Sequence, residues 1–391
     1  MTHSHEEQPV VGVETGVGMA PGRINLIGEH TDYNAGFVLP FAIEQHCLAR
    51  IRPTVDAASD APLIVHSRQS DSRVEIARGD VVPGAAWIDG PSGWAAYAAG
   101  ALWALVDAGI LPRGALAAEV ELDSTVPIGA GLSSSAAIDC SVVVAADRLF
   151  GLGLPPAQIA QLATVAETRF VRAPTGGMDQ LVSVLAERDH ALFCDMRSLQ
   201  TELIHFDPSA NGLEVLVVDS RAPHQLVAGE YRNRRLACEA AARQFGVPAL
   251  RDIDEEELPR RLAGLDDDVL RRRARHVVTE NARVLQTVEL LRGGRIREIG
   301  PLLVASHASM RDDFEITVAE VDLAVEVLLA GGVLGARMTG GGFGGCVIAL
   351  AEAGTSAALA TAVDEAYAAR GFSPPAHFVA HPGDGAVALA R

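Results

Sequence analysis

The sequence predicts a two-domain protein of the α+β class. The chain has 391 residues, which is more than one hydrophobic core usually serves. Apolar residues make up 49% of it, a composition typical of an ordered globular protein. Strand-like and helix-like segments are interleaved up to about Gln200, and helical patterns dominate after about Asn211. We therefore predict an N-terminal domain over 1–205 and a C-terminal domain over 206–391.

Each predicted element rests on its own pattern. Residues 117–123 alternate between apolar and polar side chains, which indicates a strand, and 133–149 begin with serine and stop before Gly151, which indicates a helix. The pair Pro155-Pro156 opens a second helix. The full set comprises strands at 117–123, 191–195, 212–219, 333–338 and 346–351, and helices at 133–149, 155–171, 224–245, 266–291, 295–306 and 318–330.

The charged residues exclude several classes of protein. All 32 basic residues are arginine, because the chain contains no lysine. A P-loop that ends in Gly-Lys, the lysine–glutamate pair of protein kinases and Schiff-base chemistry all need lysine and are excluded. A net charge of −18 also disfavours binding to nucleic acid or to an anionic membrane surface.

The remaining composition bears on location. No apolar run reaches the roughly 18 residues of a membrane span, and the N-terminus lacks the basic and apolar regions of a secretory signal. The five cysteines are widely spaced, none with zinc-site spacing, and lie mostly in apolar stretches, which favours buried thiols in a reducing compartment. We expect a cytoplasmic protein, present as a monomer or a weak dimer.

A glycine- and serine-rich loop joins the strand at 117–123 to the helix at 133–149. Gly129 and Gly131 allow the backbone to approach a ligand closely, and Ser133, Ser134 and Ser135 stand at the helix N-terminus, where free N–H groups favour phosphate. A serine hydroxyl there can also bind Mg²⁺. The alternative interpretation is a glycine turn with serine capping. A second loop, 339–345, has five glycines in seven positions and is expected to pass tightly against a backbone or a ligand.

Two carboxylates complete a possible set for phosphoryl transfer. Asp179 follows the pair Gly176-Gly177, and Glu167 lies on a predicted helix. Taken singly, each acid fits a solvated surface charge. Taken with the serine loop, Ser135 and Glu167 would hold Mg²⁺ and Asp179 would accept the proton of a hydroxyl group.

The segment 22–40 is the best guide to what is bound. It concentrates polar side chains between two glycines and two apolar runs, as a site for several hydroxyl groups would require. With the loops at 127–137 and 337–345, and with matching segments at 229–235 and 306–314, it resembles the galactokinase branch of the GHMP small-molecule kinases. The resemblance implies the two-domain GHMP kinase fold, with the active site in the cleft between the domains.

The resemblance also implies roles for particular residues. Asp179 would be the catalytic acceptor, with Arg23 beside it. The residues implied to bind substrate are Glu29, His30, Thr31, Asp32, Gly176 and Tyr231. Those implied to bind the nucleotide are Gly129, Ala130, Gly131, Leu132, Ser133, Ser134, Ser135 and Ser67. Ser135 and Glu167 would bind Mg²⁺.

The implied reaction is ATP-dependent phosphorylation of α-D-galactose at its anomeric O1, the entry to galactose metabolism. Two alternatives remain: a sibling sugar 1-kinase for N-acetylgalactosamine or arabinose, and a non-catalytic sensor of galactose and ATP. Gly177 stands where a bulky apolar residue is expected in many relatives, which suggests a looser floor of the sugar pocket and less strict selection of galactose.

Overall fold

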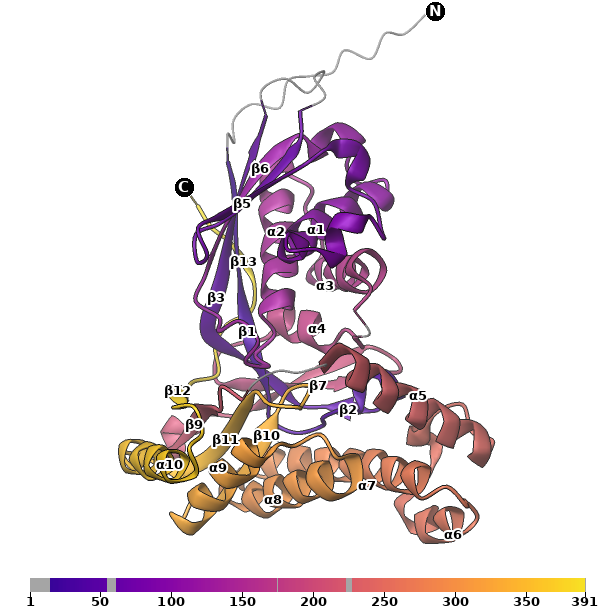
Figure 1. The fold of residues 1–391 in the computed structure, drawn as a ribbon, viewed down its shortest axis with the longest axis vertical. Coiled ribbons are helices and arrows are strands. Elements are labelled where there is room, and N and C mark those ends of the chain that lie inside the picture. The colour runs from indigo at the N-terminus through magenta and orange to yellow at the C-terminus, as the bar shows by residue number, and fades with distance from the viewer. Residues whose placement is uncertain (1–14, 55–60, 174, 223–226, 391) are drawn as a thin grey trace, which may run out of the picture.

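The computed structural model describes residues 15–54, 61–173, 175–222 and 227–390. It has two parts, each a sheet with helices packed on it, which meet at a junction and are called here the upper layer and the lower layer. In the upper layer a six-stranded sheet carries helices on one face, and in the lower layer helices pack on a four-stranded sheet (Figure 1). Within those ranges, no helix has the length and apolar character needed to cross a membrane. The structure therefore has the mixed helix-and-sheet character that the sequence predicts.

The upper layer contains most of the N-terminal half. Its sheet has the strand order β13-β1-β3-β6-β4-β5, antiparallel except for the pair β4 and β6. Its strands are β1 (Gly16–Asn25), β3 (Pro40–Pro53), β4 (Leu63–Ser67), β5 (Ser72–Ile76), β6 (Ala118–Ser124) and β13 (Val387–Ala388), and its helices are α1 (Ala96–Asp107), α2 (Ser134–Phe150), α3 (Pro156–Val165) and α4 (Met178–Leu185).

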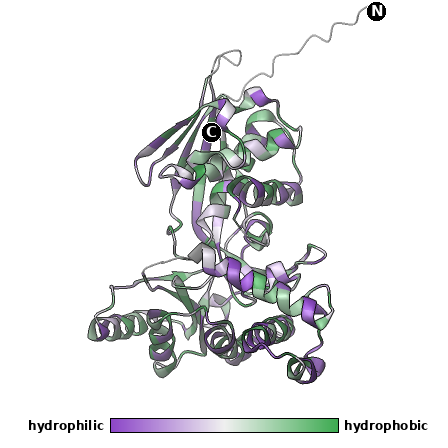
Figure 2. Ribbon diagram, turned by 45° about the vertical axis from the view of Figure 1, so that its right-hand side comes forward, coloured by the Kyte–Doolittle hydropathy of each residue, from purple (hydrophilic) through white to green (hydrophobic). Residues whose placement is uncertain are grey.

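The lower layer contains most of the C-terminal half. Its antiparallel sheet has the order β10-β11-β9-β12. Its strands are β9 (Leu213–Asp219), β10 (Gly335–Thr339), β11 (Cys346–Glu352) and β12 (Ala376–Ala380), and its helices are α5 (Val227–Phe245), α6 (Leu258–Ala263), α7 (Asp268–Arg292), α8 (Gly300–Ser309), α9 (Ala319–Ala330) and α10 (Ser356–Arg370). Along these helices, hydrophobic and hydrophilic stretches alternate (Figure 2).

A small third sheet lies at the junction. It pairs β2 (Phe37–Val38), β7 (His190–Asp195) and β8 (Gln200–His205), and β2 and β7 appear between the two layers in Figure 1. Arg251 of the lower layer donates to Asp195 over 2.9 Å, and Arg197 pairs with Asp252 over 2.7 Å. These crossed ion pairs hold the lower layer against the end of β7.

Close packing between β1 and α2 explains the glycines of the first strand. A Cβ atom added at Gly16 would lie 2.1 Å from the carbonyl oxygen of Ala145, and one added at Gly18 would lie 2.3 Å from that of Ser141. Because α2 lies directly on β1, only glycine fits at these two positions. The serine loop before α2 is thereby placed beside the segment that follows β1.

Strand β9 separates two hydrophobic cores. Val215 and Val217 belong to the first core, whereas Leu216 and Val218 belong to the second, as the alternation of a strand requires. The first core also includes residues of the six-stranded sheet and of α1–α4. All five cysteines are buried free thiols, as their sequence context predicts.

The predicted elements agree with the structure, with two refinements. The second predicted helix ends as a π-helical turn over Ala166–Val171, and the one predicted at 295–306 begins with a 3-10 turn over Ile296–Ile299 before α8. The predicted start of a helix at 224 lies outside the described residues. The boundary at 205/206 stays a prediction, but β13 returns to the first sheet and pairs with β1, so the last described strand does not belong to the lower layer.

Candidate active site

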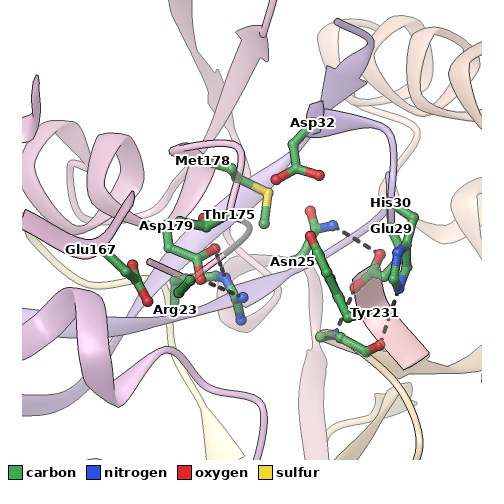
Figure 3. Close-up of a pocket in the computed structure, with 13 residues that line it drawn as sticks. Arg23, Asn25, Glu29, His30, Asp32, Glu167, Thr175, Met178, Asp179 and Tyr231 are labelled. Carbon is green, nitrogen blue, oxygen red and sulfur yellow. Dashed lines mark hydrogen bonds and ion pairs between the residues drawn. The ribbon is translucent and has the colours of Figure 1, made fainter. Parts of the chain in front are cut away.

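A cavity of about 360 Å³ lies at the junction of the two layers. Its walls come from β1 and the segment after it, from the start of α4, from α5 and from the loop that follows β10 (Figure 3). The lining residues are Arg23, Asn25, Glu29, His30, Asp32, Glu167, Ala173, Thr175, Met178, Asp179, Tyr231, Gly340 and Gly341. Seven of the residues predicted from the sequence are therefore brought together: Arg23, Glu29, His30, Asp32, Glu167, Asp179 and Tyr231.

Asp179 and Arg23 form a bidentate ion pair in this cavity. Arg23 Nε donates to Asp179 Oδ1 over 2.7 Å, and Arg23 Nη2 donates to Oδ2 over 2.9 Å. The Asp179 carboxylate is fixed in orientation by the two parallel bonds, which are stronger than bonds between neutral groups. Because Asp179 is in the first turn of α4, the partial positive charge of that helix end also faces it.

The same arginine connects the acid to the serine loop. Arg23 Nη1 donates to the carbonyl oxygen of Gly131 over 2.7 Å, and the Ser133 hydroxyl donates to Asp179 Oδ2. A second cavity, of about 380 Å³, is partly lined by this loop. It is lined by Gly129, Gly131, Thr339, Gly341, Gly342, Gly344 and Gly345.

The two glycine clusters touch each other through their backbones. A Cβ atom added at Gly340 would lie 2.8 Å from the Gly131 carbonyl oxygen, and Gly345 lies similarly close to Ala130. Gly129 and Gly131 have φ of 75° and 77°, in the left-handed region where glycine is favoured. The expectation that the second cluster passes tightly against another backbone is confirmed.

Glu167 lies in the π-helical turn after α3 and is buried. It hydrogen-bonds with the Ser135 hydroxyl and accepts a short bond from the Gln180 amide. Burial, reinforced by the charge of Asp179, raises the pKa of Glu167 to about 7. A carboxylate that is buried beside another acid and a serine hydroxyl has the composition of a Mg²⁺ site.

Asp139, one turn after Ser135 on α2, adds to this oxygen-rich region. Its carboxylate is fully buried, and neither oxygen has a hydrogen-bond partner among the described residues. The Gln180 Oε1 atom is also buried without one. Burial, and then the nearby Glu167, raises the pKa of Asp139 well above its ordinary value. The described residues contain no group of three or more His, Cys, Asp or Glu side chains placed to hold a metal, so the oxygen donors that Mg²⁺ would find here are those of Glu167 and Ser135.

Asp32 forms the opposite side of the cavity. Its Oδ2 accepts the Gly176 N–H over 3.1 Å, and a Cβ atom added at Gly176 would lie only 2.3 Å from that oxygen. Gly176 is thus required for the contact that closes this wall. Burial raises the pKa of Asp32 to about 6, although backbone N–H groups of Tyr33 and Gly176 oppose the shift.

Glu29 lines the cavity but is largely engaged by the protein. Asn25 donates to it over 2.8 Å, the Gly340 N–H donates over 2.8 Å, and Arg337 forms a buried ion pair with it. Arg337 is fully buried and also donates to backbone carbonyls of β1 and the residue after it. The geometry gives Glu29 a structural tie to β10 in addition to its predicted place at the substrate.

The ring of His30 is likewise engaged at both nitrogens. Nδ1 lies 2.8 Å from the Tyr33 hydroxyl, and Nε2 lies 3.1 Å from the Gly341 carbonyl oxygen. The ring packs against Tyr231, with 4.9 Å between ring centroids. Burial lowers the pKa of His30 to about 3, so the ring is neutral.

Two predicted residues lie away from the cavities. Thr31 is fully buried, and its hydroxyl lies 2.8 Å from the Gly28 carbonyl oxygen and 2.7 Å from that of Phe37, so its side chain holds the turn, and its contact with substrate stays a prediction. Ser67 ends β4 and lines neither cavity, and its role at the nucleotide stays a prediction. In the serine loop, Ala130 and Leu132 are buried, and only their backbones are placed to act.

The looser floor expected at Gly177 stays a prediction, but the structure shows a backbone reason for this glycine. Gly177 has φ of 90° and is the N-cap of α4, and a Cβ atom there would lie 3.1 Å from Thr164. The left-handed backbone at this position favours glycine.

Asn25 is a cavity residue that the sequence reasoning missed. Its side chain is buried, its amide donates to Glu29, and its Oδ1 has no partner among the described residues. An acceptor left free in a cavity wall is a natural contact for a ligand hydroxyl. Its position within the polar segment 22–40 was a signal that could have identified it.

Comparisons with known families match three parts of the chain. Residues 8–53 match the galactokinase galactose-binding signature, residues 96–187 match the GHMP kinase N-terminal domain, and residues 287–369 match the GHMP kinase C-terminal domain. A solved mevalonate kinase from Methanococcus jannaschii, 16% identical with a TM-score of 0.66, covers 94% of this chain and 98% of its own, which supports the fold alone.

More similar relatives are galactokinases. The Streptomyces coelicolor galactokinase is 48% identical over 95% of this chain and 93% of its own length, and that of Mycobacterium bovis is 43% identical over 91% and 94%. The crystal structure of Lactococcus lactis galactokinase complexed with galactose is 31% identical, with a TM-score of 0.87, over 96% of this chain and 95% of that one. On these matches, the chain belongs to the galactokinase family of the GHMP kinases.

Proposed function

We propose that the protein transfers the γ-phosphoryl group of ATP to O1 of α-D-galactose, giving galactose 1-phosphate and ADP. One observation carries the proposal. The Asp179–Arg23 pair lines a polar cavity suited to a monosaccharide, and Arg23 donates to Gly131, which lines a glycine-lined cavity suited to phosphates. An acceptor hydroxyl in the first cavity can therefore face a phosphate in the second.

Asp179 acts on the sugar hydroxyl. Phosphoryl transfer has a loose transition state, so the base need not be strong and mainly has to be correctly placed. The bidentate bond to Arg23 provides that placement. The Asp179 carboxylate accepts the proton of O1 as the O1–P bond forms and the bond from the γ-phosphorus to the bridging oxygen of ADP breaks. The guanidinium group of Arg23 stabilises negative charge beside the transferred group.

The glycine-lined cavity is proposed to bind the triphosphate. Close approach of the Gly129–Gly131 and Gly340–Gly345 backbones leaves N–H groups near the cavity, and the N-terminus of α2 adds a partial positive charge. Ser135 and Glu167 would hold Mg²⁺, which neutralises charge on the β- and γ-phosphates. Since the chain has no lysine, arginine supplies the remaining side-chain positive charge.

The sugar is proposed to be held by Asp32, Tyr231 and Asn25. Asp32 accepts hydrogen bonds from sugar hydroxyls while Gly176 fixes its orientation, and the free Oδ1 of Asn25 accepts another. Sites built from such polar groups reject an analogue that lacks the matching hydroxyl by up to about 10⁴-fold. The alternatives of a sibling sugar 1-kinase and of a sensor are not favoured, because the relatives are named galactokinases and the serine loop and Asp179 are intact.

A coupled ADP-release assay tests the proposal. The purified protein is supplied with ATP, Mg²⁺ and one of galactose, N-acetylgalactosamine, arabinose, glucose or mevalonate. We expect the largest kcat/KM with galactose, and ³¹P NMR of the product should place the phosphate on the anomeric oxygen. Preference for another sugar would overturn the choice of acceptor. If none of the five acceptors gave ADP release, the assignment as a kinase would be overturned.

A further inference from the structure

His30 belongs to the polar segment of the sugar cavity, but its ring contacts the loop that faces the phosphates. The Gly341 backbone lines both cavities, so a group that fixes Gly341 acts on both. His30 Nε2 lies 3.1 Å from the Gly341 carbonyl oxygen. The preceding residue, Glu29, accepts the N–H of Gly340 over 2.8 Å. Two consecutive residues of the sugar segment therefore hold two consecutive residues of the glycine loop.

The tautomer of His30 follows from its partners. A carbonyl oxygen can only accept, so Nε2 must carry the hydrogen and donate it to Gly341. In a neutral ring Nδ1 is then an acceptor, and the partner at Nδ1 is the Tyr33 hydroxyl, at 2.8 Å, which can donate. The Tyr33–His30–Gly341 chain thus has one consistent direction of donation.

Surrounding contacts hold these hydrogen-bonded groups in place. The His30 ring packs between Tyr231 and Phe314, each 4.9 Å away between centroids, and Tyr33 meets Tyr231 edge-on at 5.4 Å. His30 itself has φ of 60°, a left-handed conformation that is uncommon for a residue other than glycine. Such a backbone persists when side-chain contacts determine it, and the bonds of the ring supply those contacts.

We propose that Tyr33 is a positioning residue that fixes His30 in its Nε2–H tautomer. Through His30, Tyr33 couples occupancy of the sugar cavity to the geometry of the glycine loop that faces the phosphates. Tyr33 lines neither cavity, and its hydroxyl bonds to His30, so the effect of that hydroxyl on ligand binding passes through His30. The identity of the two ligands rests on the proposed function, whereas the His30 tautomer and the direction of hydrogen-bond donation from Tyr33 to Gly341 do not.

The decisive variant is Tyr33→Phe, which removes one hydroxyl and keeps the ring. Tyr367→Phe is the matched control, because the Tyr367 hydroxyl also donates one hydrogen bond, to the Glu320 carbonyl oxygen over 2.6 Å, at a place that neither cavity touches. A lost hydrogen bond of this kind corresponds to about 3–10-fold in affinity. Both variants are first checked by thermal melting.

Two measurements test the proposal. In ¹⁵N-histidine NMR of the unaltered protein, His30 should have the Nε2–H pattern, and Tyr33→Phe should give a mixture of tautomers while Tyr367→Phe leaves the pattern unchanged. In calorimetric titrations, Tyr33→Phe should weaken both galactose and a non-hydrolysable ATP analogue by about 3–10-fold. It should also reduce the factor by which one ligand strengthens the other.

The outcomes separate this inference from the proposed function. An Nδ1–H pattern in the unaltered protein overturns the inference even if Tyr33→Phe does not fold. A loss of galactose affinity alone, with the ATP analogue unaffected, overturns the coupling to the glycine loop. If the protein binds neither galactose nor ATP but His30 shows the expected tautomer and its dependence on Tyr33, the proposed function and the coupling of these ligands fail, while the role of Tyr33 in fixing the His30 tautomer stands.

Discussion

Arg23 and Asp179 are joined by two parallel hydrogen bonds although they are 156 positions apart in the chain, one on β1 and the other in the first turn of α4. The same guanidinium group donates to the loop that leads into α2. Three segments that are distant in sequence therefore converge on one carboxylate, and the position of Asp179 depends on the packing of β1, α2 and α4 together.

Replacing Asp179 with Asn should lower kcat by about 10²–10⁴-fold, because the amide cannot accept the proton of the sugar hydroxyl. Galactose binding, measured by calorimetry, should remain detectable, since the shape of the cavity is kept. The unaltered melting temperature serves as the folding control. Near-normal turnover in Asp179→Asn would remove this residue from the proton transfer.

Replacing Glu167 with Gln or Ser135 with Ala should raise the Mg²⁺ concentration needed for half-maximal activity by about 10-fold or more, because each change removes a proposed ligand. The check is a titration of activity against Mg²⁺ at saturating ATP and galactose, supported by Mn²⁺ binding to the nucleotide complex. Thr168→Ser, next to Glu167 but bonded to the Thr164 carbonyl, is a suitable control. Unchanged titrations would exclude Ser135 and Glu167 as ligands.

Galactose affinity should fall as the pH drops through about 6, because the pKa of Asp32 is raised to about 6 and the protonated carboxyl loses acceptor capacity. Stability should respond in the opposite direction. A folded-state pKa above the unfolded value means that the folded protein binds more protons between about pH 4 and 6, so this group makes folding less favourable as the pH rises through that window.

Asp32→Asn should remove both pH effects while weakening galactose more than ATP. Calorimetric titrations with each ligand between pH 5 and 8 give the comparison, with the melting temperature followed in parallel. The same slope of galactose affinity against pH in Asp32→Asn and in the unaltered protein would assign the titration to another group.

Asp139→Asn should make stability less dependent on pH. The buried Asp139 carboxyl has a raised pKa, so above the unfolded value of about 3.9 the protein loses stability as the pH rises, by up to about 1.4 kcal/mol per pH unit for this one group. An asparagine has no charge to bury and should abolish that slope. Urea unfolding at several pH values measures this slope. Parallel curves of unfolding free energy against pH for the two proteins would contradict the prediction.

Segments with a single strong local signal could be predicted from the sequence. The alternation at 117–123 gave β6, and the serine start and Gly151 stop gave α2 to within one residue at each end. The strands β1 and β3 could not be recognised in this way. β1 carries Gly16, Gly18 and Pro21, which lower its strand propensity, and its glycines are explained only by the approach of α2.

At the site, the sequence identified which residues gather but not what each one contacts. Thr31 and His30 lie in the same polar segment, yet one is turned into the backbone of the turn and the other spans to Gly341. Arg337 begins the glycine-rich segment 337–345, and only the structure shows that it is fully buried against Glu29. Asp139 had a visible signal, an acid one turn after Ser135 in an otherwise apolar stretch, whose meaning depends on burial.

The pairing of Met19 with Val387 places the two ends of the described chain on neighbouring strands. A ribosome that adds about 5–20 residues per second needs roughly 20–70 s to travel from the first of these positions to the second. During that time β1 presents an open row of backbone donors and acceptors, which is a template for unwanted strand pairing. The edge of β1 that pairs with β13 is therefore covered only after residues 387–388 have been synthesised.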